Sequence, residues 1–119
     1  MPPFVVALAS IAMSVTAQFL FKHGVRQAQS RAVPASLVDS LVNLALNPWI
    51  LLGFALYGVG AVVWLSVLSR WDVSKAYPLV GFGFVLTLGV GALLGETVTV
   101  LRGVGVLCIC LGVALVART

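Results

Sequence analysis

The sequence predicts an all-α membrane protein with four transmembrane helices, the size of half a transporter. Hydrophobic residues make up 61% of the 119-residue chain and charged residues 8%, too few to cover a soluble domain of this size. Four stretches carry no charged residue: 1–21, 40–69, 76–95 and 103–117. A helix needs about 20 mostly apolar residues to cross a bilayer, so each stretch can hold one span of a single domain.

The first span is expected over residues 3–21. Pro3 suits the first turn of a helix, where a missing N–H group costs nothing. Lys22 is expected to end the span at the interface, with a polar loop over 24–35. A signal peptide carries positive charge before its apolar region, whereas here the positive charges follow it, so we expect the segment to be retained.

Residues 36–47 are predicted to form a separate amphipathic helix. Polar residues recur there at steps of three and four, and leucines and valines fill the other face; the polar ones are Ser36, Asp39, Ser40, Asn43 and Asn47. Such a helix suits the membrane surface. A water-exposed extension of the second span explains the pattern equally well, and both interpretations stay open.

The remaining spans follow one another closely. Asn47-Pro48 is a helix-start signal, because a capping side chain precedes a proline at the first helical position. We expect spans over residues 48–68, 76–94 and 98–117. The last two connections are short, so neighbouring helices should run antiparallel in a compact bundle.

The first span carries a stripe of polar residues. Ser10, Ser14, Gln18 and Lys22 recur every four residues and therefore share one helix face. A glutamine facing lipid would leave its donors and acceptors unpaired, so the stripe should face protein or a wet cavity. Ser14, Gln18 and Lys22 are predicted to bind a substrate. Contacts between helices are the alternative.

Two aromatic residues are predicted to close a cavity beside this stripe. Trp64 lies in the second span, and Tyr77 opens the third beside Pro78. Aromatic residues in membrane helices commonly serve only packing, and this alternative stays open.

Helix contacts and a helix cap are predicted in the second half of the chain. Gly105 and Gly112 are seven residues apart and share a face of the fourth span. Helices in lipid associate through close approach at small residues, so we expect this face at a helix or dimer contact. Glu96 precedes the fourth span, where a carboxylate is favoured by the helix dipole, and is predicted to be a structural cap.

Enzymatic activity is not expected. The three acidic residues lie outside the interior of the spans, and the single histidine, His23, lies at the end of one. The sequence has no serine–histidine–aspartate set, metal cluster or phosphate-binding loop, so we expect no catalytic residue, metal or cofactor. The net charge of +4 is spread over helix ends, which favours contacts with membrane lipids rather than nucleic acid.

Basic residues are balanced between the two sides of the predicted bundle. One side carries Arg70, Lys75 and Arg118, and the other carries Lys22, Arg26, Arg31 and Arg102. A clear excess on one side is needed to fix orientation, and many carriers place their site between two inverted halves. We therefore expect an antiparallel homodimer, or a heterodimer with a similar short protein.

Several of these motifs carry a resemblance to a known family. They are Ala76-Tyr77-Pro78-Leu79, Leu94-Gly95-Glu96, the glycines from Gly105 to Gly112, and Ser14 to Gln18 ending in Lys22. In this order they resemble the drug/metabolite transporter superfamily, in particular EamA-like and small multidrug resistance-like four-helix proteins. Within that group the chain looks most like the small flippase subunits for aminoarabinose-phospho-undecaprenol.

The resemblance implies a flippase that moves a polyprenyl-phosphate-linked sugar across the bacterial inner membrane. Lys22 would then provide a point charge for the phosphate. The multidrug members carry an essential glutamate in the middle of the first helix, and Ser14 stands there in this chain, which argues against drug/proton antiport. A small-solute or multidrug carrier and a non-transporting scaffold subunit stay open as alternatives.

Overall fold

The computed structural model describes residues 2–31 and 36–119, and these residues form helices without a strand. The elements are α1 (Pro3–Arg31), α2 (Leu37–Leu46), α3 (Pro48–Leu68), α4 (Val73–Ala76), the 3₁₀ turn η1 (Tyr77–Val80), α5 (Gly81–Leu93) and α6 (Val100–Ala117). Four stretches are long and apolar enough to cross a membrane: Pro3–Ser30, Pro48–Leu68, Val73–Leu93 and Val100–Ala117. The predicted fold class is confirmed.

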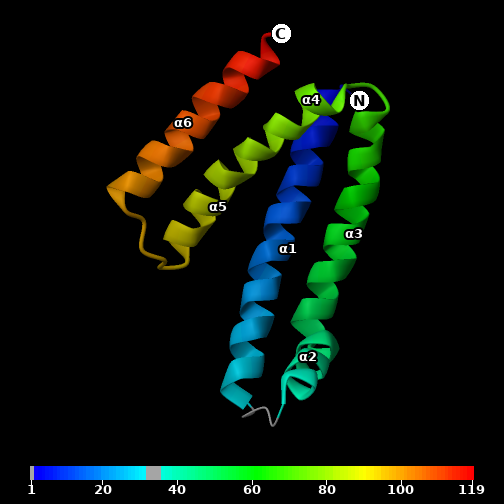
Figure 1. Ribbon diagram of the computed structural model, residues 1–119, viewed down its shortest axis with the longest axis vertical. Helices are drawn as coiled ribbons and strands as arrows, with labels where there is room; N and C mark the ends of the chain where they lie inside the picture. Colours follow the sequence, from blue (N-terminus) through cyan, green and yellow to red (C-terminus); the bar gives the residue numbers. More distant parts are fainter. Residues whose placement is uncertain (1, 32–35) are drawn as a thin grey trace.

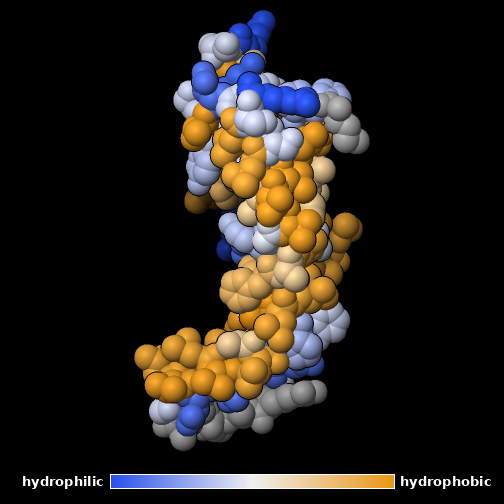
Figure 2. Space-filling model, turned by 90° about the vertical axis from the view of Figure 1, so that its right-hand side faces the viewer, coloured by the Kyte–Doolittle hydropathy of each residue, from blue (hydrophilic) through white to orange (hydrophobic). Residues whose placement is uncertain are grey.

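The helices form two hairpins that meet along α1. Figure 1 shows α1 and α3 side by side and antiparallel, with α5 running obliquely along α1 and α6 turning back beside α5. Both termini and α4 lie at one end of the molecule, and α2 lies at the other. Figure 2 shows that apolar side chains cover most of the face between the two ends.

The buried core lies where the two hairpins join, near the N-terminal end of α1. It consists of small and branched apolar side chains from both hairpins: Ala7, Ile11, Val67, Ala76, Leu79 and Val113. Gly81 lies beside this core, and a Cβ there would come within 2.7 Å of Val113. Close approach at small residues is how helices associate in lipid, so glycine lets α6 reach the core at this point.

The α1–α3 pair is held by a buried hydrogen bond and by glycine contacts. The Ser10 hydroxyl donates to the carbonyl of Gly60 over 2.7 Å, and Ser10 is only 5% exposed. A Cβ on Gly53 would lie 2.7 Å from the Phe21 ring. At Ser10, therefore, the polar stripe makes a contact between helices.

The first helix extends ten residues beyond its expected end at residue 21, because α1 continues to Arg31. The expectation of a loop is therefore wrong over residues 24–31, and residues 32–35 lie outside the described residues. Gly24 does not stop the helix. It is buried against α3, where a Cβ would lie 2.7 Å from Ile50, so this glycine permits close packing.

Helix α2 is a separate element rather than an extension of the second span. It begins after Ser36, whose hydroxyl accepts a hydrogen bond from the backbone N–H of Asp39 over 3.2 Å. Its apolar side chains are exposed, Leu37 to 75% and Leu46 to 70%. Figure 1 shows α2 nearly end-on, and Figure 2 shows an apolar ledge projecting sideways at that end. This shape suits a helix lying along a membrane surface.

Asn47 separates α2 from α3, and the predicted helix start at Asn47-Pro48 is confirmed. Its side-chain oxygen accepts hydrogen bonds from the backbone N–H groups of Trp49 (2.9 Å) and Ile50 (3.4 Å). Its amide nitrogen donates to Gln27 of α1 over 3.1 Å. One buried side chain thus caps α3 and ties α3 to the extended end of α1.

The third span begins earlier than expected and is interrupted. Helix α4 starts at Val73, and the chain tightens into the η1 turn at Tyr77–Val80 before α5 begins. Pro78 lacks the N–H group that an α-helix needs, which explains the local 3₁₀ turn. The fourth helix begins at Val100, where the Thr99 hydroxyl accepts a hydrogen bond from the N–H of Arg102 over 3.1 Å.

Replacing Asn47 by alanine should lower the free energy of unfolding by about 1 kcal/mol, the usual cost of losing an N-terminal cap. The matched control is Asn43→Ala on α2, since Asn43 is exposed and should change stability little. Reversible unfolding in mixed detergent micelles measures both. Equal stability of the two variants would contradict the capping role of Asn47.

Candidate functional site

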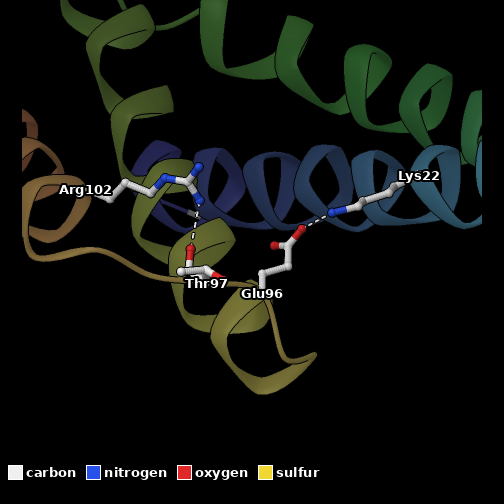
Figure 3. A network of polar contacts seen from close by, with 4 residues as sticks. All are labelled: Lys22, Glu96, Thr97 and Arg102. Carbon is white, nitrogen blue, oxygen red and sulfur yellow. Dashed lines mark hydrogen bonds and ion pairs between the residues drawn. The ribbon is translucent and has the colours of Figure 1, made fainter.

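An ion pair joins the α1–α3 hairpin to the α5–α6 hairpin just beyond the C-terminal end of α5. The Lys22 ammonium on α1 donates a hydrogen bond to the Glu96 carboxylate in the loop between α5 and α6. Figure 3 shows the two side chains extended toward one another. They keep 43% and 33% of their side-chain surfaces exposed, so a ligand can reach both charges.

Two glycines place Glu96 in this position. Gly95 has φ of +87°, a conformation that glycine adopts without strain, and it turns the chain away from α5. The Glu96 N–H then donates to the Gly91 carbonyl over 2.9 Å. The second carboxylate oxygen lies against Gly91 so closely that a Cβ there would overlap it. Gly91 therefore provides the space in which the carboxylate lies.

Arginines surround the same carboxylate. Arg102 at the start of α6 donates from Nη1 to the Thr97 carbonyl over 2.9 Å, approaching the loop from the side opposite Lys22 (Figure 3). The hydrogen bond from Lys22 holds the pKa of Glu96 below its ordinary value of 4.5. Desolvation raises this pKa, whereas the positive charges of Lys22, Arg26 and Arg102 lower it further. Because this pKa is lowered, the ionised Glu96 carboxylate stabilises the fold at pH values above the ordinary pKa. The contribution is lost as the pH falls through the lowered pKa.

A cavity opens beside the ion pair, between α1 and the α5–α6 loop. It has a volume of about 330 Å³ and is lined by Phe19, Lys22, His23, Arg26, Leu94, Gly95 and Glu96. A second hollow, of about 190 Å³, lies between α5 and α6 and includes Glu96, Thr97 and Arg102. Glu96 lines both. Three cations and one carboxylate make the region suited to an anionic or zwitterionic group.

The predicted substrate-binding residues on α1 follow one another along the helix from this cavity. Lys22 lines it directly. Gln18 is exposed one helical turn away, and Ser14 is half-buried one turn further, about 12 Å from Lys22 along α1. These residues form a polar track from the cavity toward the middle of the span.

The two predicted aromatic residues lie elsewhere. Trp64 packs against the core formed by Ala7, Ile11 and their neighbours, and Ile11 lies about 16 Å along α1 from Lys22. Tyr77 is 66% exposed at the end of the molecule that carries α4. The structure therefore does not bring Trp64 and Tyr77 together with Lys22, and their binding role stays a prediction.

The glycine face of α6 and the predicted cap also have defined places. A Cβ on Gly105 or Gly112 would meet no atom within 4 Å, so both face outward from the described part of the chain and their contact role stays a prediction. The hydroxyl that caps α6 belongs to Thr99. The Glu96 carboxylate, predicted as the cap, turns toward Lys22 instead.

Sequence reasoning missed the pairing of Lys22 with Glu96 and the part played by Arg26 and Arg102. A signal for it exists in the topology, because four antiparallel spans place the end of the first span and the last loop on the same side. Glu96 is the acidic residue of that loop, and Lys22, Arg26 and Arg102 are cations of the same side. Opposite charges there were candidates for pairing.

These features define a small four-helix membrane protein with a charged cavity between its two hairpins. The chain is 51% identical over 43 residues to a probable 4-amino-4-deoxy-L-arabinose-phosphoundecaprenol flippase subunit ArnE of Pseudomonas savastanoi, covering 36% of this chain and 38% of that protein. The protein of the same name from Serratia proteamaculans is 41% identical over 70 residues, covering 58% of this chain and 61% of that protein. The one from Yersinia pestis is 35% identical over 77 residues, covering 64% of this chain and 67% of that protein.

The chain belongs to the family of these small ArnE-type subunits, which confirms the resemblance, and it is a multi-pass protein of the bacterial inner membrane. The alignment spans less than two thirds of the Pseudomonas and Serratia relatives. No protein-family profile matches the chain, and no solved structure matches it.

Proposed function

We propose that this chain is a subunit of a flippase that moves a polyprenyl-phosphate-linked sugar across the bacterial inner membrane. The observation that carries the proposal is the cavity of about 330 Å³ in which Lys22 and Arg26 are accessible beside apolar helices. The names of the relatives, which describe a phosphoundecaprenol-linked sugar, support the same substrate class.

The geometry suits a cargo with a polar head and a long apolar tail. The headgroup enters the cavity, where the Lys22 ammonium binds the phosphate as a point charge. The polyprenyl tail stays in the lipid against the exposed apolar surfaces of the helices, which need no polar cover in a bilayer. Only the headgroup then requires a polar path.

The polar track on α1 provides part of that path. Gln18 and Ser14 offer hydrogen-bonding groups one and two turns from Lys22 toward the middle of the span. Their side chains replace water around the sugar hydroxyls at a depth where an unpaired polar group is costly. Trp64 and Tyr77 lie toward α4, away from Lys22, and the proposal assigns them to the opposite end of the path.

A second chain completes the transporter. Among the four spans α6 is the least buried, with Gly105 and Gly112 open along its outer surface. Small residues permit close approach of another helix in lipid. The partner is an antiparallel copy of this chain or a similar short protein, since the nearly balanced basic residues do not favour one orientation.

Replacing Lys22 by glutamine should reduce binding of a polyprenyl-phosphate-linked sugar roughly ten- to hundredfold. The reason is the loss of a hydrogen bond to a charged group, which costs about 1.5–3 kcal/mol. Lys22→Arg should keep part of the affinity because the charge is kept. Flux in proteoliposomes and binding to the purified full chain measure the effect.

The matched control is Lys75→Gln, which removes the same charge from a side chain that lies over the Trp71 ring near α4. Gln18→Ala should lower flux without lowering the yield of folded protein. Full activity of Lys22→Gln, or an equal loss in Lys75→Gln, would contradict phosphate binding at Lys22.

Replacing Gly112 by leucine should weaken association of the chains, because the side chain would hold a second helix away from α6. Gly58→Leu on α3 is the control, since a Cβ there also meets no atom within 4 Å. Cross-linking in native membranes measures the association. A monomeric wild-type chain, or equal cross-linking of all three proteins, would contradict an interface at α6.

A further inference from the structure

The carboxylate of Glu96 has no task in binding a phosphate. It neutralises Lys22, the cation that the proposed function assigns to the phosphate, and it lies in the same cavity. Two separate features place it there: the positive φ of Gly95, and the space that Gly91 leaves because it has no side chain. A purely anionic headgroup would be bound better by this cavity without Glu96.

We propose that Glu96 binds the ammonium group of an amino sugar, so that the Lys22–Glu96 pair opens to hold both charges of a zwitterionic headgroup. This inference rests on the proposed function and adds the residue that determines sugar selectivity. The phosphate binds to Lys22 while the protonated amine of the sugar binds to Glu96. One ion pair within the protein is exchanged for two ion pairs with the ligand, and each of the new pairs joins one positive and one negative charge.

The exchange is physically favourable because the resident pair is weak. Lys22 and Glu96 keep 43% and 33% of their side-chain surfaces exposed, and ion pairs that water can reach contribute little to stability. The headgroup instead makes charge-assisted hydrogen bonds at both ends. Binding costs little in lost protein contacts and gains two contacts with the ligand.

The distribution of cations fixes which end of the headgroup goes where. Arg26 lies one turn beyond Lys22 on α1 and lines the same cavity, so the α1 wall is positive and suits the phosphate. Glu96 provides the negative charge of the opposite wall, where Leu94 and Gly95 are its neighbours in the cavity. A neutral sugar would leave the Glu96 carboxylate without a partner once the phosphate had taken Lys22, so the cavity selects for the amine.

Selectivity between matched lipids tests the assignment. The full chain is captured in nanodiscs from native membranes, so that it keeps the assembly in which it occurs. Two synthetic ligands are used: a polyprenyl-phosphate-linked 4-amino-4-deoxypentose and the same lipid with its amine N-formylated, which removes the positive charge. Wild-type protein should bind the amine about tenfold more tightly than the formylated lipid.

Glu96→Gln should abolish this preference by weakening binding of the amine about tenfold while leaving the formylated lipid unchanged or bound more tightly. Glu96→Asp, which keeps the charge, should retain part of the preference and guards against a loss of fold. Asp72→Asn, which removes an exposed acid near α4, should bind both lipids as wild type does.

The result that would overturn the proposal is an equal affinity of wild type for both lipids, or an equal effect of Glu96→Gln on both. In either case Lys22→Gln would still weaken both lipids alike, so the proposed function would stand without the selectivity. If wild type binds neither lipid and Lys22→Gln changes nothing, the proposed function and the inference both fail.

Discussion

The ion pair between Lys22 and Glu96 is the charged contact between the α5–α6 loop and α1, and the candidate site is built around it. The apolar core around Ile11 and Val113 joins the hairpins at one end of α5, and the ion pair joins them at the other. Just beyond the core α5 still lies close to α1, since a Cβ on Gly83 would be 3.4 Å from Val15, one turn further along α1 than Ile11. The charged contact lies at the edge of the cavity and leaves the space beside it unfilled.

The distribution of polar contacts between the helices follows from their lipid surroundings. In lipid, burying apolar surface gives helices no reason to associate, so packing relies on small residues and hydrogen bonds. The α1–α3 pair uses Ser10, Gly53 and Asn47 in this way. The α5–α6 hairpin has fewer such contacts, and α6 exposes most of its length. The hairpin that carries Glu96 is therefore the less constrained of the two, which suits a loop that releases Lys22 when a headgroup binds.

Hydrophobicity alone predicts the four spans, and the Asn47-Pro48 pair predicts the start of α3, because both signals are local. The extent of α1 was not predictable in this way. Gly24 is a residue type that commonly ends a helix, and its packing against Ile50 shows why a glycine lies here inside the helix. The candidate site was predicted in part. Lys22 was found from its spacing, whereas the role of Glu96 depends on a contact between residues 74 positions apart, which helical periodicity does not contain.

Exchanging the two charges tests the central claim most directly. Lys22→Glu and Glu96→Lys each place like charges together and should each lower the free energy of unfolding. The double variant restores an opposite pair in reversed order, so it should be more stable than the sum of the two single effects predicts. Unfolding of all four proteins in the same micelles gives this comparison. Strict additivity of the two substitutions would contradict an ion pair that joins the hairpins.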